Sequence, residues 1–158
     1  MTAITADTGA AESPSKARLR LWLKLLKSSR LIEEEIRRRM RAELDTTLPR
    51  FDVMSALSRA PDGLRMSEIS HSLRVSNGNI TGIVDRLAEQ GLALRVTVPA
   101  DRRANIVRLT PRGKKVFAEH AARHEAWLDE ILGGLDTTDM TEMVQHFDHL
   151  LNTLREDG

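Results

Sequence analysis

The sequence contains no cysteine. That single absence excludes disulfide bonds, thiol nucleophiles, cysteine–zinc sites and thiol redox sensing. The chain also lacks a glycine-rich phosphate loop, a nucleophile elbow and a pair of carboxylates in a recognisable catalytic setting. We therefore expect a protein that is not an enzyme and that needs no cofactor.

Long apolar runs are missing as well. No stretch is long and apolar enough to predict a membrane-spanning helix, and residues 1–16 are polar, without the apolar core of a secretory signal. These features predict a cytoplasmic protein with no membrane partner and a disordered lead over residues 1–16. The 158 residues suit one domain extended by dimerisation helices.

Neither sign of charge predominates, since the formal net charge is only +1. Its distribution is more informative. Residues 86–115 hold eight basic and two acidic side chains, whereas residues 119–158 hold two basic and ten acidic ones. The central segment is therefore expected to face a polyanion, and the C-terminal third to avoid one.

What the sequence does have is apolar periodicity. It predicts helices over residues 18–43, 50–59, 66–73, 77–90, 112–132 and 139–155. Alternating segments at 92–98 and 105–109 predict a β-hairpin with a polar tip at 99–104. The joint at 74–76 makes the third and fourth helices a helix-turn-helix. The predicted fold class is mainly α with a small β-hairpin wing, a winged helix-turn-helix flanked by N- and C-terminal dimerisation helices.

The predicted domain organisation is a first helix at 17–48, a DNA-binding domain at 49–111 and C-terminal helices at 112–158. Pro49 is expected at the first position of the second helix, Thr110 as the cap of the fifth, and Asp136 or Thr137 as the cap of the sixth. The first and last helices carry more apolar surface than a chain of this length covers, which predicts a homodimer. The alternative is that these two helices cover each other within one subunit.

The fourth predicted helix has the pattern of a DNA-recognition helix. Ile80, Ile83, Val84 and Leu87 follow the helical period and should point inward. The outward face is polar and small, as a major groove requires, and the predicted DNA contacts on this helix are Ser76 as its N-cap, Asn77, Asn79, Thr81 and Arg86. Gly82 costs the helix about 1 kcal/mol relative to alanine, which suggests that its backbone approaches DNA closely.

The predicted hairpin tip carries Arg102 and Arg103. Arginine at such a tip suits a narrow minor groove, where negative potential concentrates. An ordinary solvated loop is the alternative, and the preceding helix-turn-helix argues against it.

Residues 101–110, Asp-Arg-Arg-Ala-Asn-Ile-Val-Arg-Leu-Thr, resemble the wing signature of the MarR transcriptional regulators, with Val107 in place of the usual leucine. Residues 80–87 resemble the family's recognition helix, and the likeness extends over residues 18–155. The resemblance implies that Asp101 supports the wing by orienting Arg103, and that Thr81 and Arg86 are contact positions. Arg65 stands where the family often has a capping threonine. The resemblance further implies a homodimer on palindromic double-stranded DNA, acting as a repressor released by a small molecule.

Residues 21–26, 31–39 and 47–52 resemble the subgroup that responds to hydroxycinnamoyl-CoA thioesters. The ligand-binding residues predicted on that basis are Trp22, Phe51 and Trp127 as walls of an apolar cleft and Arg37 and Arg38 at its mouth. Alternatives remain open. Glutamates four residues before these arginines would make ordinary helix-stabilising pairs, and the tryptophans would belong to the core. The effector could be a free phenolic acid or another lipophilic compound, and the protein could be a winged-helix module that binds protein.

Two histidine pairs have spacings that would suit a metal, His120 with His124 and His146 with His149. No carboxylate–histidine signature accompanies them. We therefore expect core or solvated histidines and no metal.

Overall fold

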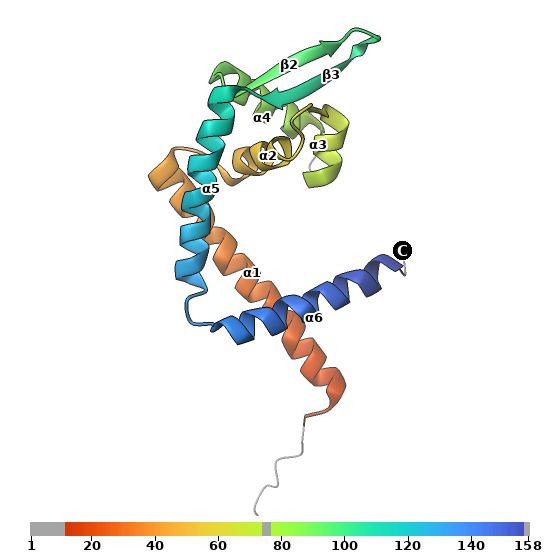
Figure 1. Ribbon diagram of the computed structural model, residues 1–158. Coiled ribbons are helices and arrows are strands. Elements are labelled where there is room, and N and C mark those ends of the chain that lie inside the picture. Colours follow the sequence, from red (N-terminus) through yellow and green to blue (C-terminus); the bar gives the residue numbers. More distant parts are fainter. Residues whose placement is uncertain (1–11, 74–76, 157–158) are drawn as a thin grey trace, which may run out of the picture.

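The computed structural model describes residues 12–73 and 77–156. Its elements are α1 (Pro14–Leu44), α2 (Leu48–Ser58), β1 (Leu64–Arg65), α3 (Met66–Leu73), α4 (Asn77–Glu89), β2 (Ala93–Val98), β3 (Asp101–Leu109), α5 (Pro111–Ile131) and α6 (Thr137–Glu156). In Figure 1, α2, α3, α4 and the β2–β3 hairpin form one module, α1 and α5 lead away from it, and α6 lies at the far end. The predicted fold class is confirmed.

Four helices begin earlier than predicted: α1 by four residues, α2 and α6 by two, and α5 by one. Ser13 caps α1 by accepting a hydrogen bond from the Lys16 amide, and proline follows in the first turn, where no amide is needed. Residues 14–16 are therefore helical rather than part of a disordered lead. Thr47 caps α2 in the same way, accepting from the Arg50 amide. The helix consequently begins at Leu48, and Pro49 is its second residue rather than its first.

The sheet is larger than the predicted hairpin. Its order is β1-β3-β2, all antiparallel, because the two-residue strand β1 pairs Leu64 with Val107 and Arg65 with Ile106. The strand β3 begins at Asp101, which pairs with Val98 after a register shift in β2. The predicted tip at 99–104 is therefore wrong for residues 101–104, which continue the strand and leave a two-residue turn.

The predicted helix boundaries are confirmed at three caps. Gly91 ends α4 with a φ of +71°, a conformation that glycine adopts readily. Thr110 caps α5, where its hydroxyl accepts from the Gly113 amide at 2.9 Å. Asp136 caps α6 by accepting from the Asp139 amide at 2.9 Å, which decides between the two predicted residues. At α3, the Glu68 carboxylate accepts from the Arg65 amide at 2.6 Å, so this cap needs no threonine.

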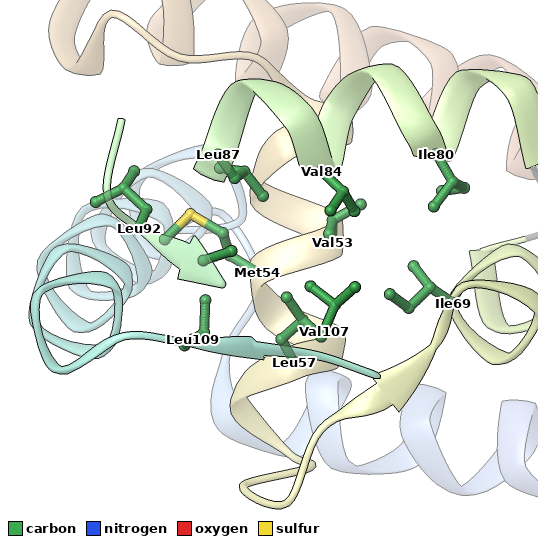
Figure 2. Close-up of a cluster of buried hydrophobic side chains, with 11 residues drawn as sticks. Val53, Met54, Leu57, Ile69, Ile80, Val84, Leu87, Leu92, Val107 and Leu109 are labelled. Carbon is green, nitrogen blue, oxygen red and sulfur yellow. The ribbon is translucent and has the colours of Figure 1, made fainter. Parts of the chain in front are cut away.

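The interior is divided into two hydrophobic cores. The first lies inside this module and gathers side chains from α2, α3, α4 and the sheet (Figure 2): Val53, Met54, Leu57, Ile69, Ile80, Val84, Leu87, Leu92, Ala93, Val107 and Leu109. The second joins α1, α2 and α5 through Ile36, Met40, Phe51 and Trp127. Phe117 on α5 packs against both cores, and its ring centroid lies 5.5 Å from that of Phe51.

The terminal helices leave a broad apolar surface open. No residue of α6 is buried. The large apolar side chains that are exposed on the two helices are Leu19, Leu21, Trp22, Leu23, Leu26, Leu31, Met140, Met143, Val144, Phe147, Leu150, Leu151 and Leu154. The alternative that α1 and α6 cover each other within one subunit is therefore wrong.

Candidate DNA interface and adjoining cavities

The helix α4 presents a small polar face to solvent because its apolar face is fixed in the first core. Ile80, Val84 and Leu87 are at most 1% exposed, and Ile83 is partly buried. This confirms the predicted inward face. On the other side, the predicted contacts Asn79, Thr81 and Arg86 are exposed, as is Gly82.

Several predicted contacts cannot be placed in the same way. Ser76 lies outside the described residues. The backbones of Asn77, Arg102 and Arg103 belong to α4 and β3, but their side chains lie outside the described part of the chain. Asp101 is exposed at the start of β3. Its predicted role toward Arg103 stays a prediction.

An ion pair joins the recognition helix to the wing. The Arg95 guanidinium on β2 lies 2.7 Å from the Asp85 carboxylate on α4. Both side chains are at least one-third exposed, so the pair adds little to stability. The pair directly links α4 to β2, the two elements that flank the turn at Gly91. This contact was not predicted, because it depends on how the turn at Gly91 brings β2 back beside α4.

The base of the wing is anchored to α5 by a compact set of hydrogen bonds. The Thr110 hydroxyl donates to the Gly91 carbonyl at 2.7 Å, and the Thr110 amide donates to the Leu92 carbonyl at 3.1 Å. Only a glycine fits at position 113, since a Cβ there would lie 1.9 Å from the Leu92 oxygen. The hairpin and the long helix α5 therefore move together.

A groove of about 840 Å³ lies between the end of α1, the start of α2 and the recognition helix. We call it the basic groove, lined by Arg37, Arg41, Thr47, Leu48, Pro49, Arg50, Asn79, Gly82, Ile83 and Arg86. Two of its four arginines have acidic partners on their own helix: Arg37 pairs directly with Glu33 one turn before it, and Arg86 lies 3.6 Å from Glu89. Arg41 and Arg50 make no ion pair with another described residue. The groove is thus a concentration of positive charge beside α4.

A second cavity, of about 260 Å³, adjoins the groove at Leu48. We call it the apolar cavity; its lining is Ser29, Ile32, Glu33, Ile36, Leu48, His124 and Leu128. Four of these seven side chains are aliphatic, from α1, α2 and α5. The His124 ring lies against Phe51, with centroids 4.9 Å apart. A hydrophobic space with few polar groups is typical of a small-molecule site.

The pKa values of two groups near the apolar cavity, His124 and Asp52, are shifted toward the neutral forms. Burial lowers the pKa of His124, against the opposing charge of Asp52. Burial likewise raises the pKa of Asp52, while His124 and Arg37 lower it and Glu33 raises it. His124 is therefore a neutral imidazole at neutral pH, able to accept a hydrogen bond.

Arg38 contacts different residues from Arg37 and does not line the basic groove. It donates two hydrogen bonds to Glu35, at 2.8 and 2.7 Å, and lines neither cavity. Glu35 also accepts from Arg39, and these two arginines hold the pKa of Glu35 at about 2. Arg39 in turn reaches Glu130 on α5 at 2.7 Å. This network connects α1 to α5. Arg38 is part of it through its pair with Glu35 and is therefore engaged in a structural contact.

The predicted aromatic walls do not line either cavity. Phe51 and Trp127 are 7% and 4% exposed within the second core, where Phe51 supports His124 from behind. Trp22 is 55% exposed on the first half of α1. The residues of the apolar cavity that were not predicted as ligand-binding are four aliphatic side chains and three polar ones, Ser29, Glu33 and His124.

Within residues 12–73 and 77–156, no three histidine, aspartate or glutamate side chains lie close enough to hold a metal ion. His146 and His149 are exposed on α6, while His120 and His124 are half-buried on α5. No helix in this part of the chain is both long and apolar enough to cross a membrane.

Comparison with known proteins places these features in context. A sequence profile of the MarR family matches residues 44–104. The chain is 30% identical to a MarR family transcriptional regulator of known structure from Silicibacter pomeroyi; the match covers 90% of this chain and 99% of that one, with a TM-score of 0.74. It is 27% identical to the transcriptional activatory protein BadR of Rhodopseudomonas palustris, over 97% of this chain and 90% of that protein. Sco3205, a MarR family regulator from Streptomyces coelicolor solved in complex with DNA, has the same fold at 17% identity, with a TM-score of 0.74 over 92% of this chain and 91% of that one.

Proposed function

The chain belongs to the MarR family of DNA-binding transcriptional regulators, which are not enzymes, and from this premise we propose that it binds a palindromic operator as a homodimer. The observation that carries the proposal is the exposed polar face of α4 beside the wing. The DNA contacts we propose are Ser76, Asn77, Asn79, Thr81 and Arg86 from the recognition helix and Arg102 and Arg103 from the wing. Acting on chromosomal DNA, the protein would work in the cytoplasm.

The two sets of contacts should differ in what they do. Helix residues in a major groove read base edges, whereas wing arginines in a minor groove add grip that depends little on sequence. We expect Thr81→Ala to reduce the preference for operator over random duplex. Arg103→Ala should weaken binding to both duplexes. Mobility-shift titrations with the duplex upstream of the protein's own gene test this, and unchanged affinity for Arg103→Ala would remove the wing from the mechanism.

Dimerisation is supported by the apolar side chains that α1 and α6 leave exposed. A two-fold axis through these helices would bury both surfaces at once. It would also set two recognition helices against half-sites roughly 34 Å apart, one turn of the DNA helix. Analytical ultracentrifugation at micromolar concentration tests this, and a monomeric protein would contradict it.

Repression is the form of control we propose, because a dimer of this size seated on a promoter blocks access to it. The relative BadR is named as an activatory protein, so the sign requires its own measurement. Transcription in vitro from the protein's own promoter should fall as protein is added. A rise would replace repression with activation while leaving DNA binding intact.

We propose further that an aromatic acyl-CoA, such as a hydroxycinnamoyl-CoA, releases the protein from DNA. The support is that the apolar cavity and the basic groove share the lining residue Leu48. The aliphatic side chains of the cavity suit an aromatic ring, and the arginines of the groove suit nucleotide phosphates. In this arrangement Arg37 lies beside the phosphates. Arg38, held by Glu35, would contribute only by exchanging partners.

The effector proposal is tested by direct binding to the DNA-free protein. 4-Hydroxycinnamoyl-CoA should bind more tightly than 4-hydroxycinnamate, because only the thioester reaches the groove. Arg50→Ala should weaken binding of the thioester and not of the free acid, and Arg59→Ala, at the end of α2 and in the lining of neither space, is the matched control. Equal affinity for thioester and free acid would favour the alternative of a regulator that responds to phenolic acids.

A further inference from the structure

We infer that the apolar cavity selects an uncharged aromatic ring carrying a hydroxyl group, and that Glu33 and His124 are the residues that recognise this hydroxyl. The inference rests on the proposed role of the cavity as the site for an aromatic group. It goes further by specifying which aromatic compounds enter and which end of them enters first.

Three polar side chains line an otherwise aliphatic space: Ser29, Glu33 and His124. Glu33 uses one carboxylate oxygen for Arg37, and its second oxygen has no partner among the described residues. Neither ring nitrogen of His124 hydrogen-bonds to another described residue, although the ring itself is held in place against Phe51. The lining therefore offers two acceptors from different helices, the half-exposed Glu33 on α1 and the half-buried His124 on α5.

The charges around the cavity favour a neutral donor over an anion. The charged groups that bear on His124 and its surroundings are Glu33, Arg37 and Asp52. Arg37 is already paired with Glu33, so these groups comprise two carboxyl groups and a single guanidinium. A ligand carboxylate placed here would meet net negative charge and a neutral imidazole. A phenolic hydroxyl, un-ionised at neutral pH, donates to either acceptor without that repulsion.

These constraints also orient the ligand. With its hydroxyl at Glu33 and His124, the ring lies among Ile32, Ile36 and Leu128. The opposite end of the ligand then leaves past Leu48 into the basic groove, where negative charge is favourable. A free phenolic acid entering the other way round would bring its carboxylate to the acidic end.

The experiment compares matched ligands on the DNA-free, full-length protein by isothermal titration calorimetry. The probes are 4-hydroxycinnamoyl-CoA and cinnamoyl-CoA, which differ by one oxygen atom, and the methyl esters of the two acids, which lack the CoA group. The variant is His124→Phe, which keeps an aromatic ring against Phe51 and removes the acceptor nitrogens. Ser29→Ala is the control, since it removes a hydroxyl from the same lining.

We expect the wild-type protein to bind each hydroxylated probe about tenfold more tightly than its partner, corresponding to about one hydrogen bond. His124→Phe should abolish most of this preference, and the readout is the ratio of the two affinities within each pair rather than either affinity alone. Equal binding of the two members of each pair, or a preference that survives in His124→Phe, would overturn the inference. The hydroxylated methyl ester could bind more tightly than its partner while the thioesters bind no more tightly than the esters. That result would support the inference and contradict the acyl-CoA proposal.

Discussion

Replacing Gly82 with alanine should make the protein more stable and its DNA binding weaker. Gly82 is the sixth residue of α4, in the helix interior, and a Cβ added there meets no other described atom within 4 Å. The substitution therefore gains helix propensity without steric cost inside the protein. That gain is about 1 kcal/mol per subunit. For a chain of this length it corresponds to a rise in melting temperature of about 2–4 °C.

The same methyl group would project from the exposed face of the recognition helix. If the α4 backbone approaches DNA as closely as a small residue at this position allows, the added carbon separates helix from base edges and weakens neighbouring hydrogen bonds. We expect a loss of operator affinity of at least tenfold, or about 1.4 kcal/mol. The single added carbon atom would then raise the stability of the protein and lower its affinity for the operator.

The assay pairs differential scanning calorimetry with a mobility-shift titration at fixed salt, because protein–DNA affinities depend steeply on ionic strength. Gly134→Ala is the matched control: its added Cβ also meets open space, and it lies between α5 and α6, away from DNA. Unchanged operator affinity for Gly82→Ala would refute the close approach. A lowered melting temperature would refute the reasoning about the helix.

Three further outcomes are expected. Leu151→Glu on the apolar stripe of α6, 49% exposed in the single chain, should convert the dimer to monomer in sedimentation and weaken DNA binding, while Gln145→Glu on another face should do neither. Gly113→Ala should destabilise the fold by about 3 kcal/mol and lower the melting temperature by about 6–12 °C, because its Cβ would lie 1.9 Å from the Leu92 oxygen; an unchanged melting curve would contradict the tight junction. Burial lowers the pKa of His120 and His124 below their ordinary value of about 6.5. The unfolded chain therefore binds protons more readily than the folded one. The free energy of unfolding should be highest above pH 6.5 and should fall as the pH drops from there through the lowered pKa values. The loss between pH 7.5 and 5.5 should be smaller in His124→Phe, and an equal loss would show that His124 contributes nothing.

The long helices were predictable because their apolar periodicity extends over several turns. The inward face of α4 followed from four residues at helical spacing, and the caps at Thr110 and Asp136 followed from short side chains at helix starts. The strand β1 was not predictable in this way, since two residues carry no period. The residues assigned to the hairpin tip are polar and lack the alternating apolar pattern of a strand, so the continuation of β3 to Asp101 could not be predicted from them.

The cavities were harder to predict than the elements that form them. Large aromatic residues were natural choices for ligand walls, but Phe51 and Trp127 are needed to fill the second core. A cavity is space left over where α1, α2 and α5 fail to pack fully, and periodicity gives no information on how three helices are offset. The Asp85–Arg95 pair was missed for a related reason, because it depends on the path of the chain between α4 and β2.

The position of Phe117 between the two hydrophobic cores has a consequence for how the molecule melts. Phe117 is partly buried and packs against both, while α2 supplies Phe51 to one core and Val53 and Met54 to the other. Cooperative unfolding requires that neither core survive the loss of its neighbour, and contacts shared between them provide that coupling. Shortening this one side chain would leave α2 as the main remaining connection between the cores, and we expect the melting transition to become broader as the coupling weakens.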